Sequence, residues 1–493
     1  MGLLEHRCSG VLLHLSSLPS PGGIGTMGRC ARDFVDFLEL AGQSCWQILP
    51  ICPTGYGNSP YQSPSSFAGN PYFIDLEELE EKGLLNGEEV RKADAGRNPE
   101  RVDYGTLYEK RNPLLNIAAQ RFLDDLEDGF GLFCAANAAW LEDHALFMAI
   151  KRYHGGAPWY SWKRPLRERE EQALAQFSAE HVREIAAEKA LQYLFYGQWK
   201  RLKEYANAKG VSIIGDMPIY VAMDSVEVWA HRELFQLDED GMPAEVAGCP
   251  PDGFSADGQF WGNPLFDWEY MARSNYSWWV NRVDHLCGLY DVLRLDHFRG
   301  LDAYYAIPAG QGNSRGGRWR QGPGRELLAA MGERPLLAED LGFLTPSVRQ
   351  LLAESGCPGM KVLQFAFDSR EGDESHLPHK YPEYCVAYSG THDNDTFAGW
   401  LSGAPGPDAA YARAYLRLGK ERPCWDALCA LWATQARVAV VQGQDLLALG
   451  REGRMNTPGT LGDNWSWRAK GRSFTKKMAQ EIREKMELYG RIS

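Results

Sequence analysis

The chain has 493 residues, of which 44% are hydrophobic and 24% are charged, as is typical of a globular protein with a substantial core. Its net charge of −13 argues against nucleic acid or an anionic membrane as a partner. The 11 cysteines are scattered without a CxxC pair, and no apolar stretch could span a bilayer, so we expect buried thiols, no disulfide framework and a cytoplasmic location.

Short apolar runs recur along the chain, and most of them end in a polar residue followed by a loop. Helical patterns separate several of these runs, for example at residues 33–42, 347–356 and 425–441. Strands that alternate with helices predict an α/β fold, a (β/α)8 TIM barrel. A doubly wound open sheet is the alternative, but the glycines of residues 21–28 do not fit its GxGxxG turn. The eight predicted strands are residues 10–15, 45–51, 211–219, 289–298, 335–340, 360–367, 385–393 and 445–450.

Large insertions interrupt the alternation, because far more residues separate the second and third strands than one crossover needs. Within the second insertion, residues 249–264 (CPPDGFSADGQFWGNP) are rich in proline, glycine and aromatic residues. We expect this segment to be a lid or binding loop and not a regular element. The predicted division is 1–51 (strands one and two), 52–210 (a helix-rich insertion), 211–219 (strand three), 220–288 (the second insertion) and 289–493 (the rest of the barrel).

Charged residues lie at the carboxyl ends of four predicted strands. In YDVLRLDHFRG, Arg294 and Asp296 share one strand face, which should point into the barrel, whereas the ring of His297 should start outside this cluster. Arg294 should keep Asp296 ionised by lowering its pKa. A structural ion pair would explain this stretch alone, but acids at four strand ends indicate an active site. The other strand ends contribute Asp216, Glu339, Asp340, His392 and Asp393.

Several carboxylates with an arginine and a histidine, and no serine or cysteine nucleophile pattern, suit glycosyl transfer. There, one carboxylate attacks the sugar and one carboxylic acid protonates the leaving oxygen. The alternative is a metal-dependent barrel hydrolase, which usually needs several histidines, whereas the first strand offers only His14. We therefore predict no metal and no cofactor.

Three motifs, LRLDHFRG, LLAEDLG and SGTHDNDT, resemble in their order those of the α-amylase superfamily of retaining glycosidases. A wider set covers residues 14 to 468 and is similar to amylomaltases, the 4-α-glucanotransferases also called disproportionating enzymes. This set is HLSSLPSPGGIGTMG, TGYGNSPYQSPSSFAGNP, IIGDMPIYVAMDS, PPDGFSADGQFWGNP and MNTPGTLGDNWSWR.

The resemblance implies a role for each matching residue. Asp296 would be the nucleophile, Glu339 the general acid/base, and Asp393 a third carboxylate that grips the sugar hydroxyls. The further implied residues are Arg294, Asp216 and His392 around the bond that breaks, Ser59 and Tyr61 on the donor side, Gln259 and Trp261 in a mobile loop over the site, Asn464 in a late NW motif, and Tyr56 in a glucan site outside the active site.

The leading hypothesis is a retaining 4-α-glucanotransferase that acts on maltooligosaccharides and α-1,4-glucans through a covalent glucosyl-enzyme. An α-1,4-glucan hydrolase with the same carboxylates is the alternative, and a glucan-binding protein on a decayed barrel is a third, against which the intact carboxylates count. Asp296 and Asp393 should raise the pKa of Glu339 by repulsion. The loop with Phe254, Phe260 and Trp261 should exclude water and stack an acceptor sugar. Retention predicts carboxyl groups of Asp296 and Glu339 about 5–5.5 Å apart.

Overall fold

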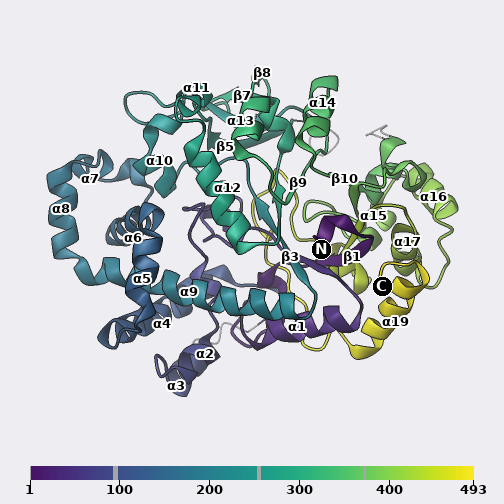
Figure 1. The fold of residues 1–493 in the computed structure, drawn as a ribbon, viewed down its shortest axis with the longest axis horizontal. Coiled ribbons are helices and arrows are strands. Elements are labelled where there is room, and N and C mark those ends of the chain that lie inside the picture. The colour runs from purple at the N-terminus through teal and green to yellow at the C-terminus, as the bar shows by residue number, and fades with distance from the viewer. Residues whose placement is uncertain (1, 93–97, 252–256, 343, 370–373, 493) are drawn as a thin grey trace.

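The computed structural model of the chain describes residues 2–92, 98–251, 257–342, 344–369 and 374–492. Eight parallel strands form one curved sheet in the order β10-β11-β12-β1-β2-β3-β6-β9. The two end strands approach each other, because the Ala338 N–H at the end of β9 donates to the Pro358 carbonyl just before β10 (3.0 Å), which nearly closes a barrel (Figure 1). The predicted fold class is therefore confirmed. The strands are β1 Cys8–Leu12, β2 Cys45–Gln47, β3 Ser212–Met217, β6 Val292–Leu295, β9 Leu336–Ala338, β10 Gly359–Val362, β11 Cys385–Tyr388 and β12 Val438–Gln442.

The eighth strand is β12, so the prediction of a strand at residues 445–450 is wrong. The predicted helix over residues 425–441 ends early, as α17 (Pro423–Trp432), and a completely buried strand follows it. Valines 438, 440 and 441 favour a strand that is covered on both faces, but such a continuous apolar run resembles a buried helix in sequence. The residues after the strand form the short helix α18 (Gly443–Leu446), in which the buried Asp445 accepts a hydrogen bond from the Phe397 N–H (2.7 Å).

The chain between β2 and β3 is helical and lies to one side of the barrel, at the left of Figure 1. Its longest helix, α9, buries Leu191, Phe195, Trp199 and Leu202 at helical spacing, and α4 and α6 pack against it. The helices of this segment are α2 Leu76–Glu81, α3 Gly87–Lys92, α4 Tyr104–Asp124, α5 Gly129–Ala136, α6 Ala138–Tyr153, α7 Arg164–Arg167, α8 Glu171–Glu180 and α9 Val182–Ala208.

A second, antiparallel sheet has the strand order β5-β4-β7-β8 and was not predicted. It overturns the expectation that residues 249–264 contain no regular element, because Cys249 ends β4 and residues 259–264 form β5. The aromatic residues Phe260 and Trp261 favour a strand, and pairing with β4 satisfies its backbone, while the glycines and prolines gather near its ends. Residues 252–256, with the predicted Phe254, lie outside the described residues. The strands are β4 Glu245–Cys249, β5 Gln259–Pro264, β7 Ala303–Pro308 and β8 Arg318–Gln321.

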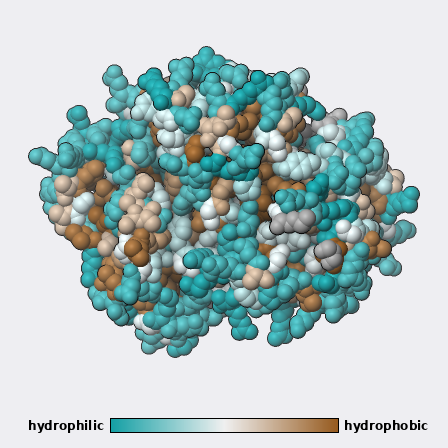
Figure 2. All heavy atoms as spheres, in the orientation of Figure 1, coloured by the Kyte–Doolittle hydropathy of each residue, from teal (hydrophilic) through white to brown (hydrophobic). Residues whose placement is uncertain are grey.

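The remaining helices complete the crossovers and cover the barrel. They are α1 Arg29–Leu40, α10 Val226–Ala230, α11 Trp268–Ala272, α12 Ser277–Leu289, α13 Gly324–Met331, α14 Pro346–Ser355, α15 Phe397–Gly403, α16 Gly406–Tyr415 and α19 Lys476–Leu488. Among the described residues, no helix combines the length and apolar character that crossing a membrane requires. The molecular face drawn in Figure 2 is mostly hydrophilic, with small scattered apolar areas.

Candidate active site

An ion-pair chain links the ends of two neighbouring barrel strands. Asp216 on β3 and Arg294 on β6 are paired in register, so both side chains point into the barrel. One guanidinium nitrogen of Arg294, Nη1, donates to both carboxylate oxygens of Asp216 (2.8 and 2.9 Å) and to Oδ1 of Asp296 (2.8 Å). The Asp296 N–H donates to the Met217 carbonyl (3.0 Å), which fixes the residue just after β6. The contact expected between Arg294 and Asp296 is present.

Asp216 lies behind this arginine and not at the cavity wall. Its side chain is completely buried, and it accepts a hydrogen bond from the Tyr61 hydroxyl (2.7 Å) in addition to those from Arg294. Asp216 therefore contacts Arg294 and Tyr61 and is not among the residues that line the cavity.

His297 faces the cavity, contrary to the expectation from strand alternation. The strand ends at Leu295, and His297 adopts a left-handed backbone conformation (φ 51°), so the two-residue period no longer applies. Its ring meets the Trp261 ring edge-on, with the ring centres 4.9 Å apart, and both side chains line the cavity.

Glu339 follows β9 directly, at the strand end beside Asp296. Its Oε2 accepts from the His297 N–H (2.7 Å) and its Oε1 from the Leu341 N–H (3.0 Å). Burial raises the pKa of Glu339 to about 8; the positive Arg294 opposes this rise and the negative Asp296 adds to it. The sequence predicted the direction of this shift, but burial is its largest cause.

Burial also raises the pKa of Asp296, to about 6, although Arg294 works in the opposite direction. The predicted net lowering is therefore wrong. The side chain of Asp296 is 27% exposed, but it opens only onto the cavity, so the surrounding protein still disfavours its charge. The pKa of Glu339 lies above that of Asp296, so Asp296 ionises first as the pH rises and Glu339 keeps its proton to higher pH.

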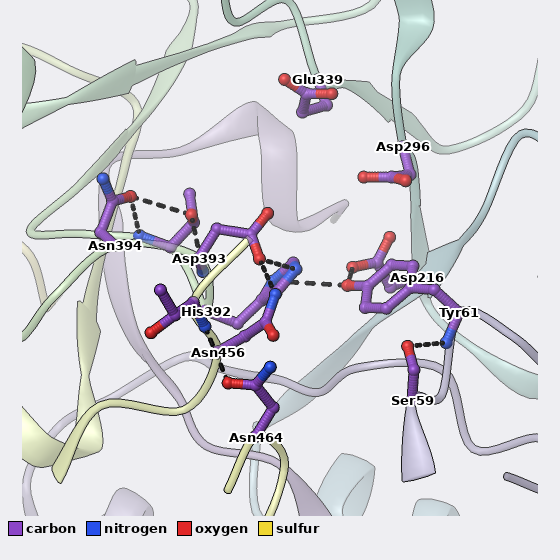
Figure 3. A network of polar contacts seen from close by, with 12 residues as sticks. Ser59, Tyr61, Asp216, Asp296, Glu339, His392, Asp393, Asn394, Asn456 and Asn464 are labelled. Carbon is purple, nitrogen blue, oxygen red and sulfur yellow. Dashed lines mark hydrogen bonds and ion pairs between the residues drawn. The ribbon is translucent and has the colours of Figure 1, made fainter. Parts of the chain in front are cut away.

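Asp393 is held by Asn456 of the late motif MNTPGTLGDNWSWR (Figure 3) and by Arg454, which directly precedes this motif. Its Oδ1 accepts from the Asn456 amide (2.6 Å) and lies 3.4 Å from Nε2 of His392, while its carbonyl accepts from Arg454 Nη2 (2.7 Å). The Tyr61 ring stacks on His392, with the ring centres 4.9 Å apart. Asn456 was not predicted as a site residue, although its motif is part of the family resemblance. Nothing in the local sequence shows which carboxylate its amide contacts.

The other predicted residues also line the cavity, where several of them stabilise loops. The Ser59 hydroxyl accepts from the Tyr61 N–H (3.2 Å). The Trp261 indole N–H donates to the Gln259 side chain (3.1 Å), and the Asn464 side chain accepts from the Thr457 N–H (3.0 Å). Tyr56 begins a short 3-10 helix, Tyr56–Asn58, but its side chain lies outside the described part of the structure, so its predicted role stays a prediction.

These side chains surround one cavity of about 1780 Å³, larger than a typical small-molecule site. The carboxyl groups of Asp296, Glu339 and Asp393 border the same space (Figure 3). Within the described ranges, no three His, Cys, Asp or Glu side chains are grouped so as to hold a metal ion. The predicted residues that line the cavity are Ser59, Tyr61, Gln259, Trp261, Arg294, Asp296, Glu339, His392, Asp393 and Asn464.

Carboxylates at the carboxyl ends of a parallel eight-stranded barrel, facing one long cavity, define a TIM-barrel enzyme. The family model described as 4-alpha-glucanotransferase matches residues 13–475. The chain belongs to this family, and the predicted class of enzyme is confirmed.

Individual relatives agree over nearly the whole chain. A 4-alpha-glucanotransferase from Thermus thermophilus is 49% identical over 94% of each chain. One from Clostridium butyricum is 43% identical over 97% of this chain and all of its own. The solved amylomaltase from Streptococcus agalactiae in complex with acarbose is 41% identical, with a TM-score of 0.95 over 99% of this chain and 100% of that one.

Proposed function

We propose that the protein moves α-1,4-glucan segments between maltooligosaccharides by a retaining mechanism. The observation that carries this proposal is the pair of unlike carboxyl groups at neighbouring strand ends. Asp296 is held by Arg294 and ionises first, while Glu339 keeps its proton to higher pH, and both face one cavity. A nucleophile and a general acid are what the first step of retention requires.

In the first step, a carboxylate oxygen of Asp296 attacks the anomeric carbon of the donor. The bond between this carbon and the glycosidic oxygen breaks, and the proton of Glu339 passes to that oxygen. The product is a covalent glucosyl-enzyme on Asp296, and the remainder of the donor leaves. Asp393 has Oδ1 occupied by Asn456, so Oδ2 is available to accept from sugar hydroxyls.

In the second step, Glu339 takes the proton from the 4-hydroxyl group of an acceptor sugar. The acceptor oxygen bonds to the anomeric carbon, and the bond to Asp296 breaks, which restores both carboxyl groups. Two displacements at one carbon retain its configuration. We expect the two carboxyl groups to be about 5–5.5 Å apart, as this mechanism requires.

The acceptor decides between transfer and hydrolysis, since the same carboxylates serve both reactions. A sugar competes with bulk water only if binding gives it a large effective concentration. Trp261 is placed to supply this, because its ring lies against His297 beside the nucleophile and faces the cavity. The family match favours transfer over the hydrolase alternative.

The two insertions would bind the glucan, while the barrel strands carry the chemistry. Cavity-lining residues include Asn112 of α4 and Glu188 of α9 from the first insertion, and Trp261 of β5 from the second. The division at residues 52–210 and 220–288 is therefore proposed as a functional one as well. Cys8, Cys45 and Cys385 are buried thiols outside any disulfide, in keeping with the proposed cytoplasmic location.

Incubation with pure maltotriose tests the proposal. Transfer yields glucose and a ladder of longer maltooligosaccharides with little gain in total reducing ends, whereas hydrolysis raises reducing ends in step with glucose. Trp261→Ala should slow transfer and raise the ratio of hydrolysis to transfer. A wild-type enzyme whose reducing ends track glucose would overturn the transferase proposal. An unchanged ratio in the variant would instead remove Trp261 as the cause of transfer.

A further inference from the structure

Trp319 on β8 differs from the other tryptophans of the protein. All 16 tryptophans lie among the described residues, and 15 of them are buried or half-buried. Trp319 is 41% exposed, in the second sheet outside the barrel. A water-exposed indole leaves a large apolar face and an N–H donor available for a ligand.

The ring of Trp319 is held in one orientation. The guanidinium carbon of Arg299 lies 3.8 Å from its centre, and the ring of Tyr305, its cross-strand partner, meets it edge-on at 5.1 Å. The Tyr305 hydroxyl donates to the Ser314 carbonyl (3.3 Å), and a Cβ on Gly317 would lie 2.3 Å from the Tyr305 ring, so only glycine fits there. A ring fixed in this way loses little entropy when a ligand stacks on it.

Arg299 connects this ring to the active site. It is buried, lines the cavity, and belongs to the 3-10 helix Phe298–Leu301, which starts two residues after the nucleophile. The Phe298 N–H of this helix donates to the Glu339 carbonyl (3.1 Å), so the helix lies beside Glu339, which takes the proton of the acceptor in the proposed mechanism. A row of side chains therefore leads away from Asp296. His297 and Trp261 line the cavity beside it, and Arg299 links the cavity to Trp319 on the second sheet.

We propose that Trp319 is an outer acceptor subsite, which stacks a glucosyl unit of a chain that extends beyond the cavity. This inference rests on the proposed function, because its ligand is the same α-1,4-glucan. The C–H face of a pyranose would cover the indole, and the indole N–H can donate to a hydroxyl. The neighbouring arginines 318 and 320 share the single carboxylate of Glu245, so the flank of the ring keeps an excess positive charge, and its guanidinium groups can donate to sugar hydroxyls.

The test is transfer from a fixed activated donor, maltosyl fluoride, to a short acceptor, glucose, and to a long one, maltoheptaose. Trp319→Ala should raise the KM for maltoheptaose about three- to tenfold, while the KM for glucose and kcat stay unchanged. Trp319→Phe, which keeps an aromatic face, should retain most of the affinity. The matched control is Trp425→Ala, since Trp425 on α17 also carries an arginine over its ring, Arg422 at 4.6 Å, and is not among the residues lining the cavity.

An unchanged KM for maltoheptaose in Trp319→Ala would overturn the inference. So would an equal rise for glucose, because that would place the effect inside the cavity. If the alanine variant does not fold, Trp319→Phe and Trp319→Leu decide the question, since only the loss of the aromatic face should raise the KM for the long acceptor. A wild-type protein that transfers to neither acceptor would refute the proposed function. This outcome differs from the two that would overturn the role of Trp319 alone.

Discussion

Glu339→Gln separates the role of Glu339 as an acid from its role as a structural acceptor. The glutamine keeps the shape and one acceptor oxygen for the two backbone N–H groups of His297 and Leu341, but it has no proton to give. General acid catalysis contributes about 10²- to 10⁴-fold, so we expect a loss of this size with maltotriose. A donor with a fluoride leaving group needs no protonation, so with this donor the first step should recover most of its rate.

The pH dependence gives an independent reading of the same substitution. In the wild type, activity should be lost as the pH rises through about 8, because Glu339 would give up its proton there. In Glu339→Gln this alkaline limb should vanish from the residual rate of the first step, measured as glucose release from maltotriose. Equal losses on maltotriose and on the fluoride donor, or an alkaline limb that persists in the variant, would refute the assignment of Glu339 as the general acid.

Three more predictions concern the pH dependence of the enzyme and the other two carboxylates of the site. The kcat/KM of the wild type should follow a bell with limbs near pH 6 and 8, because Asp296 must be deprotonated while Glu339 is protonated; one flat limb would contradict this. Asp296→Asn should abolish turnover but leave glucan binding, measured by calorimetry, largely intact. Asn456→Ala should lower kcat/KM about 10- to 100-fold and add little in an Asp393→Asn background, whereas Ser466→Ala, which removes a bond within the same loop, should have little effect.

The barrel and its carboxylates were predictable from sequence because both depend on local pattern. Apolar runs that end in Asp216, Asp296 and Glu339 identify strands and their carboxyl ends without knowledge of the packing. The eighth strand was placed wrongly because a continuous apolar run such as that of β12 carries no period that separates strand from helix. The second sheet was missed since β4 pairs with β7, whose partner residues lie 57 to 63 positions further along the chain.

The detailed chemistry of the site depends on contacts between distant segments. The pKa of Asp296 rises instead of falling because burial by surrounding segments outweighs the nearby Arg294. The inward turn of His297 follows from a left-handed backbone conformation that a non-glycine residue rarely adopts. The bond between Asn456 and Asp393 joins segments 63 residues apart, so only the folded chain reveals it.

In the proposed mechanism, the placement of Asp296 beside Glu339 also supplies the change of role that the second step needs. In the free enzyme, the negative charge of Asp296 adds to burial in raising the pKa of Glu339, which helps to keep Glu339 protonated. Once Asp296 is esterified by the sugar, this charge is gone, while Arg294 stays and continues to lower the pKa of Glu339. The pKa of Glu339 therefore falls in the glucosyl-enzyme. Glu339 stays a carboxylate there and can accept the proton of the incoming sugar. When the ester breaks, the charge returns to Asp296 and Glu339 holds that proton again, ready for the next donor.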